Sequence, residues 1–202
     1  MNKEELLEYI KSLVEETSLR NGWDEAYRNH ISIVPKMAEE LLDIPRFANA
    51  DKFTVLMGAW LHDFAKMNCN LGENRKEGVL EIHKVHHIEG YKLAKEVLSG
   101  KLPEEEVEKI AQCVLRHRNR EDYPATTDEE MLVAAADSMS HFKSIVYLLY
   151  YYYYPNSQIS EMVTHQLGKV ERDWRDVSLI PEAAEMCRKE YEVIKSMLES
   201  NK

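Results

Sequence analysis

The sequence predicts an all-α protein, a single-domain helical bundle of about seven to nine helices. Only seven Gly and six Pro occur among the 202 residues, fewer than a turn-rich β protein requires. Apolar residues recur at helical spacing along the chain, and no run alternates in the manner of a strand. Because the sequence also shows no internal repeat and no flexible linker, residues 1–202 are predicted to form one domain.

The predicted helices each combine an apolar periodicity with a start or stop signal. They cover residues of about 3–17, 24–42, 51–66, 82–99, 103–117, 128–154, 156–171 and 181–199. An Asn-Gly pair follows the first helix, and Asp24 and Asp128 are typical N-caps of the second and sixth. Pro35 is expected to kink the second helix, and Pro103, followed by three glutamates, starts the fifth. Residues 68–78 are rich in Asn and Gly and are predicted to form a loop, a frequent place for substrate contacts.

Charge and composition exclude several kinds of partner. The chain has 26 basic and 36 acidic residues and a formal net charge of −10, so a broad surface for a nucleic-acid polymer is not expected. No apolar run approaches the roughly 20 residues that span a bilayer, and the charged N-terminus does not read as a signal peptide, so no membrane association is expected. The three cysteines are widely spaced, without a CxxC pair, and fit a cytoplasmic protein.

The most informative local feature is the pair His62–Asp63 within LHDFAK at 61–66. The pair lies in an apolar stretch, where a carboxylate and an imidazole are costly unless a partner or a metal compensates them. Both groups are good ligands for divalent transition metals. Similar residues occur on the other predicted helices, namely His30, His86, His87, His117 and Asp137. This distribution predicts a metal site assembled from several helices.

Taken in order, these residues resemble the signature of the HD-domain metal-dependent phosphohydrolase superfamily, which is a His, a His-Asp pair and a distant Asp. LHDFAK is similar to its central motif, HHIEG at 86–90 to its His-x-x-x-Gly helix start, and VLRH at 114–117 and AAD at 135–137 to the remaining positions. The resemblance covers about residues 24–145 and leaves 146–202 as a C-terminal helical extension.

The resemblance implies a ligand set. In the family, one divalent metal is held by residues that match His30, His62, Asp63 and Asp137. Members with two further histidines hold a second ion, bridged by the Asp of the pair, and His86 and His117 match those positions. His87 is the alternative to His86, and the four-residue step to Gly90 favours His86. We therefore expect two divalent transition-metal ions, drawn from Mn, Fe, Co, Ni and Zn, because histidine-rich sites favour these over Mg.

Asp63 and Lys66 are the expected catalytic residues. Lys66 lies one turn after Asp63, where it could reach a phosphate oxygen. Arg116, Arg118 and Arg120 are further candidates for phosphate recognition, since guanidinium groups bind phosphate through two hydrogen bonds. Cations at the end of a helix also complement its dipole, which is an equal explanation for these arginines.

The implied activity is hydrolysis of a small phosphate ester, a nucleotide or dinucleotide, by a metal-bound hydroxide. Two alternatives stay open. One is a di-iron oxygenase of the HD-domain type, and the other is a nucleotide-binding regulatory module without turnover. A small-molecule phosphate, a nucleotide, is the expected partner of the phosphohydrolase and of the regulatory module.

Taken singly, these residues also have structural explanations. A lone His on an apolar helix face is usually packed in the core, and Asp63 with Lys66 is by default a surface ion pair worth little. His83, His141 and His165 match no position of the signature and are interpreted as structural. The tyrosine run at 150–154 fits core packing, a pocket wall or the interface of a homodimer.

Overall fold

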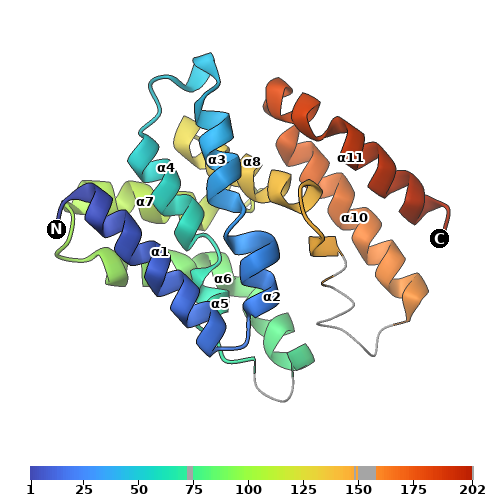
Figure 1. The fold of residues 1–202 in the computed structure, drawn as a ribbon, viewed down its shortest axis with the longest axis horizontal. Coiled ribbons are helices and arrows are strands. Elements are labelled where there is room, and N and C mark those ends of the chain that lie inside the picture. The colour runs from blue at the N-terminus through green and yellow to red at the C-terminus, as the bar shows by residue number, and fades with distance from the viewer. Residues whose placement is uncertain (72–74, 148, 150–157, 202) are drawn as a thin grey trace.

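The computed structural model describes residues 1–71, 75–147, 149 and 158–201 (Figure 1). These ranges hold helices and no strand, apart from one isolated bridge between Arg120 and Tyr123. The all-α prediction is therefore confirmed. Within the described ranges, every helix is too short or too polar to span a lipid bilayer.

The elements follow one another along the chain and are named here in order. They are α1 (Lys3–Arg20), α2 (Asp24–Ala26), the π-helical turn η1 (Tyr27–Ile31), α3 (Val34–Leu42), the 3-10 turn η2 (Pro45–Phe47), α4 (Lys52–Leu61), α5 (Phe64–Met67), α6 (Arg75–Leu98), α7 (Glu104–Arg116), α8 (Asp128–Phe142), α10 (Ile159–Val177) and α11 (Pro181–Glu199).

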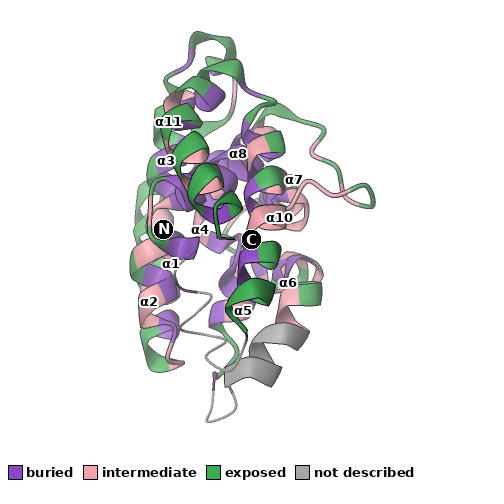
Figure 2. Cartoon of the chain, turned by 90° about the vertical axis from the view of Figure 1, so that its right-hand side faces the viewer, coloured by how far each residue is buried: buried purple, intermediate pink, exposed green. Residues whose placement is uncertain are grey.

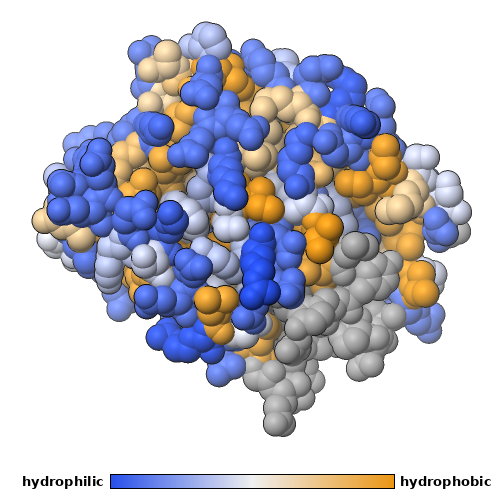
Figure 3. Space-filling view, in the orientation of Figure 1, coloured by the Kyte–Doolittle hydropathy of each residue, from blue (hydrophilic) through white to orange (hydrophobic). Residues whose placement is uncertain are grey.

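Helix α8 lies at the centre of the arrangement (Figure 1). It contacts α3, α4 and α7 on one side and α10 and α11 on the other. Its residues Ala134, Ala135 and Ala136 are at most 2% exposed, so small side chains let neighbouring helices approach. Figure 2 shows buried residues gathered where α4 and α8 face their neighbours. On the face seen in Figure 3, apolar atoms form small patches among hydrophilic side chains, as the charged composition requires.

The predicted helix at 51–66 is wrong in one respect that matters for function. Helix α4 ends at Leu61 and α5 begins at Phe64, so the His62–Asp63 pair lies in the break between them. Asp63 has φ −110° and ψ 10°, close to the sparsely allowed region in which many active-site residues are found. The break turns both polar side chains toward the interior.

The helix predicted at 24–42 is also interrupted, and the interruption comes before Pro35, the residue expected to kink it. The π-helical turn η1 carries His30, and Pro35 lies in the first turn of α3, where a missing N–H costs nothing. A π-turn adds a residue within a helical segment and is frequent at functional sites. Here it places His30 in a buried position.

Three further boundaries differ from the predictions. Helix α6 begins at Arg75, so the loop expected at 68–78 is too long. Thr127, and not Asp128, caps α8, because its side chain accepts from the Glu130 N–H in a capping box. Helix α8 ends at Phe142 and does not continue to residue 154, since Lys143 leaves the helical conformation and binds α11 at Met186 and Glu190. The tyrosine run at 150–154 lies outside the described residues.

Close packing of α6 against α7 brings two of the candidate ligands together. A Cβ at Gly90 would lie 2.9 Å from Val114 Cγ1, so only glycine fits there without displacement. Gly90 follows His86 by one turn, and Val114 precedes His117 by three residues. The missing side chain therefore allows both imidazoles to reach the same point.

Candidate metal centre

Four imidazoles and two carboxylates from five elements meet in the interior. His30 comes from η1, His62 and Asp63 from the break between α4 and α5, His86 from α6, His117 from the end of α7, and Asp137 from α8. Five of the six are buried, and the Asp137 side chain is 14% exposed. All six residues expected from the sequence are thus brought together.

The hydrogen bonds of each imidazole fix its tautomer. The Nδ1 atoms of His62, His86 and His117 lie 2.7, 2.9 and 2.6 Å from the carbonyl oxygens of Ala59, His83 and Val114. Because a carbonyl oxygen only accepts, each Nδ1 carries the proton and each Nε2 presents a lone pair. This arrangement orients histidine ligands in metal sites.

His30 is oriented in the same way through a hydroxyl group. Ser140 Oγ donates to the Asp137 carbonyl oxygen at 2.7 Å, so it accepts from His30 Nδ1 at 2.8 Å. The Nε2 atom of His30 is then also free of a proton. All four imidazoles therefore turn an unprotonated nitrogen toward the centre.

These donor atoms form two groups that share one carboxylate. In the first group, His30 Nε2 lies 3.1 Å from His62 Nε2, 3.4 Å from Asp63 Oδ2 and 3.3 Å from Asp137 Oδ1. In the second, His86 Nε2 lies 3.2 Å from His117 Nε2 and 3.3 Å from Asp63 Oδ1. Asp63 thus directs one oxygen to each group.

This donor set fits two divalent ions. Ligands about 2.1 Å from a tetrahedral ion lie about 3.4 Å from one another. In the first group, His30 Nε2 and His62 Nε2 lie 3.1 Å apart, and each lies 3.3 to 3.8 Å from the facing oxygens of Asp63 and Asp137. Asp63 Oδ1 is buried and accepts no hydrogen bond from any described residue. A buried carboxylate oxygen and facing lone pairs are costly without a cation between them.

The electrostatics keep the donors in their metal-binding protonation states. Burial lowers the pKa of His30 to about 4 and that of His117 to about 3, and it also holds the pKa of His86 well below its ordinary value. Burial by itself would raise the pKa of Asp63, but Lys66 and the surrounding imidazoles reverse this and lower it well below its ordinary value. At neutral pH the imidazoles of His30, His86 and His117 are therefore neutral and the Asp63 carboxylate is ionised.

Lys66 is more than the surface partner that its spacing suggests. Its Nζ lies 2.7 Å from Asp63 Oδ2, and the two side chains are only 13% and 3% exposed. The lysine also holds the pKa of His83 at about 2, which keeps that neighbouring imidazole neutral. His87, the alternative to His86, turns away toward Tyr123 and Arg118.

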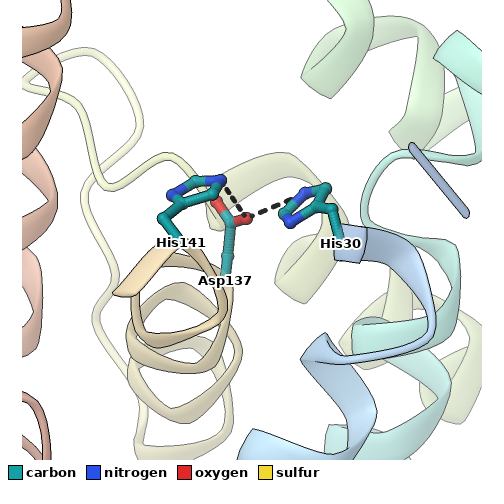
Figure 4. A group of neighbouring side chains, drawn as sticks. All are labelled: His30, Asp137 and His141. Carbon is teal, nitrogen blue, oxygen red and sulfur yellow. Dashed lines mark ion pairs between the residues drawn. The ribbon is translucent and has the colours of Figure 1, made fainter. Parts of the chain in front are cut away.

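One histidine interpreted as structural belongs to the site. His141 stacks on His30 with 4.8 Å between ring centroids, and its Nε2 lies 3.7 Å from Asp137 Oδ1. Figure 4 shows the Asp137 carboxylate between the two imidazoles. On its other side, His141 Nδ1 lies 3.1 Å from Asp173 of α10. The spacing of four residues from Asp137 on one helix is the signal that could have identified it.

A cavity of about 500 Å³ opens from this cluster. The described cations that line it are Lys66, Arg118, Arg120, Lys169 and Arg172, with His83, His141 and His165 beside them. Arg116 is not among the described lining residues, because its guanidinium binds Gln112, the Pro124 carbonyl and Glu130. Trp23, Met67, Val146 and Leu149 supply an apolar part of the wall. The cavity therefore suits an organic ligand that carries negative charge.

Comparison with known families agrees with this geometry. The HD domain family matches residues 27–141, more than half of the chain, and the match spans every candidate metal ligand. The chain therefore belongs to the HD domain family, within the superfamily of metal-dependent phosphohydrolases. No curated protein and no solved structure gives a match.

Proposed function

We propose that this chain is a metal-dependent phosphohydrolase that acts on a small phosphate ester, a nucleotide or dinucleotide. The observation that carries the proposal is the position of Asp63, whose two carboxylate oxygens face two separate groups of unprotonated donors beside a cation-lined cavity. Membership of the HD domain family supports the same reading.

The proposed ligand assignment follows the two groups of donors. His30, His62, Asp63 and Asp137 would hold one divalent ion, and Asp63, His86 and His117 the other. Bound divalent ions supply Lewis-acid polarisation of a phosphoryl oxygen and a lowered pKa of water. The second group offers only three protein donors, which leaves room for water or substrate, as in catalytic sites.

The cations have a separate task in this proposal. Lys66 Nζ neutralises Asp63 and faces the cavity, where it can also bind a phosphate oxygen. Arg118 donates to the carbonyl oxygens of His83 and Lys84, which ties the loop after α7 to α6 beside the metal ligands. Arg120 lines the same cavity and can bind phosphate through its guanidinium. A phosphate ester is favoured over an uncharged substrate because these positive charges line the cavity, where the aspartates belong to the metal cluster or pair with basic residues of α10.

The test combines elemental analysis of the purified protein with a screen for phosphate release. Nucleotides, dinucleoside polyphosphates and generic phosphate esters would be offered in the presence of Mn. We expect close to two metals per chain and phosphate release that Asp63→Asn abolishes while helicity is retained. Bound iron with oxygen consumption and no phosphate release would point to an oxygenase, and tight nucleotide binding without turnover to a regulatory module.

A further inference from the structure

The cavity receives cations from a helix outside the family match. The HD domain match ends at residue 141, and α10 begins at Ile159. From α10, His165, Lys169 and Arg172 all line the cavity that contains the metal cluster. Residues spaced by four and three positions share one helix face. This face of α10 therefore forms a wall of the cavity, and this wall lies outside the family match.

Lys169 and Arg172 differ in what balances their charge. Lys169 Nζ lies 3.1 Å from Asp173 Oδ2 and 3.0 Å from His141 Nδ1, so a carboxylate of its own helix neutralises it. Within the described residues, Arg172 and Arg120 form no ion pair with a carboxylate. Both side chains are half-buried in the cavity wall. Asp173 and Asp176 also line the cavity, but they pair with Lys169 and Arg175. The two guanidinium groups thus bring positive charge to the cavity that no ion pair among the described residues neutralises.

The loop after α7 is hydrogen-bonded to α10 beside the cavity that both arginines line. Asn119, with a positive φ of 45°, donates from Nδ2 to Asp176 Oδ1 at 3.3 Å and accepts from the Ala125 N–H at 3.0 Å. The left-handed conformation is one that Asn tolerates. Arg120 follows directly, and burial together with Arg118 and Arg172 lowers the pKa of its guanidinium. Like charges that act on one another in this way are stabilised when an anion lies between them.

We propose that Arg120 and Arg172 form a second phosphate-binding subsite, so that the substrate carries at least two phosphate groups. One phosphate would lie at the metal cluster, and the other between the loop after α7 and the cationic face of α10. A cavity of about 500 Å³ has room for both together with an organic group. Guanidinium groups suit this role because their planar donors match phosphate oxygens. The position of one phosphate at the metal cluster rests on the proposed function. The binding of the other phosphate by Arg120 and Arg172 does not depend on it.

The first experiment is independent of turnover. Protein dialysed against EDTA is titrated with inorganic pyrophosphate in a calorimeter, for the wild type, Arg120→Gln, Arg172→Gln and Arg188→Gln. Arg188 is a matched control, because it lies on α11, 51% exposed, and does not line the cavity. We expect each of the first two variants to weaken pyrophosphate binding about tenfold or more, with Arg188→Gln like the wild type. Unchanged affinity in Arg120→Gln and Arg172→Gln, or no binding by the wild type, overturns the subsite.

The second experiment identifies how the two phosphates are joined. The metal-loaded enzyme is assayed with a nucleoside monophosphate, a nucleoside diphosphate and a nucleoside 3′,5′-bisphosphate. We expect a higher kcat/KM for one of the two-phosphate substrates, and a ratio to the monophosphate that falls about tenfold in Arg172→Gln. A ratio that stays unchanged in the variant contradicts the proposal. If no phosphate ester is hydrolysed, the proposed function fails, while the pyrophosphate titration still decides the subsite.

Discussion

His86 and His117 meet nitrogen to nitrogen, with 3.2 Å between their Nε2 atoms, although each imidazole carries its proton on Nδ1. Two lone pairs that face each other in the interior repel, and no hydrogen bond can form between them. A cation between the two nitrogens removes this repulsion. The same relationship holds between His30 and His62 at 3.1 Å.

Added metal should therefore stabilise the fold. Free metal at 100 times its Kd adds about 2.7 kcal/mol to the free energy of unfolding, which for a chain of this size raises Tm by about 5–10 °C. Thermal unfolding of EDTA-treated protein, with and without Mn, Co or Zn, measures this. An Asp63→Asn variant should show a much smaller shift, and a wild-type Tm that no metal changes would contradict a metal centre.

Removal of one histidine of the second group should change the number of bound metals. His117→Ala is expected to reduce bound metal from about two ions per chain to about one, because the remaining pair of donors is too weak a site. His87→Ala is the matched control, since His87 is equally buried but faces Tyr123. Elemental analysis of both variants gives the answer. Loss of metal in His87→Ala instead would exchange the roles assigned to His86 and His87.

Ser140 should influence metal affinity without touching the metal. Its hydroxyl accepts from His30 Nδ1, so Ser140→Ala leaves that proton without its partner and loosens the ring. Loss of such an outer hydrogen bond lowers metal affinity about 10–100-fold. Competition with a fluorescent chelator measures the affinity, and Ser99→Ala, at an exposed position after α6, serves as the control. Equal affinity in both variants would remove Ser140 from the site.

Lys66→Met should retain metal but weaken catalysis. The ammonium group bonds to Asp63 at 2.7 Å and faces the cavity, and a charged hydrogen bond of this kind is worth about 1.5–3 kcal/mol. We expect kcat/KM to fall about 10–100-fold, with metal content unchanged. Lys92→Met, on the exposed face of α6, should behave like the wild type. A Lys66→Met protein that loses its metal would make Lys66 a structural support of Asp63.

The metal-free protein should lose stability as the pH falls from about 6.5 to about 4. His30 and His117 have a pKa of about 4 and about 3 in the folded protein, both lowered chiefly by burial, against about 6.5 when unfolded. In this window the unfolded chain binds protons that the folded chain does not, so stability rises with pH. Urea unfolding of EDTA-treated protein at several pH values tests this. A His117→Phe variant should show a smaller dependence on pH, and an equal dependence would assign it to other groups.

Much of the candidate site could be predicted from the linear order of residues. His30, the His62–Asp63 pair, His86, His117 and Asp137 lie on separate helical segments, and their order along the chain matches the family signature. Helical periodicity likewise predicted α7 and α11 to within one residue, whereas the helix predicted at 156–171 ends six residues before α10 does, at Val177. Such patterns are local, so they can be read without knowledge of the packing.

Other features depend on contacts between distant segments. The break between α4 and α5 falls within an apolar stretch whose sequence pattern predicts one helix. At this break Asp63 lies beside donors from other helices, which the local pattern does not show. His141 matched no pattern because its partner Asp173 lies on a later helix. Arg172 was missed for the same reason, since only the packing of α10 on α8 carries it into the cavity.

The sequence by itself therefore determined the helical class, the family and the identity of the candidate ligands. These depend on residue type and on spacing along single helices, which short-range geometry dictates. Only the tertiary structure decided which nitrogen of each imidazole faces inward, that Asp63 divides its oxygens between two donor groups, and that α10 completes the cavity. Each of these depends on the approach of segments far apart in the chain, which packing alone sets.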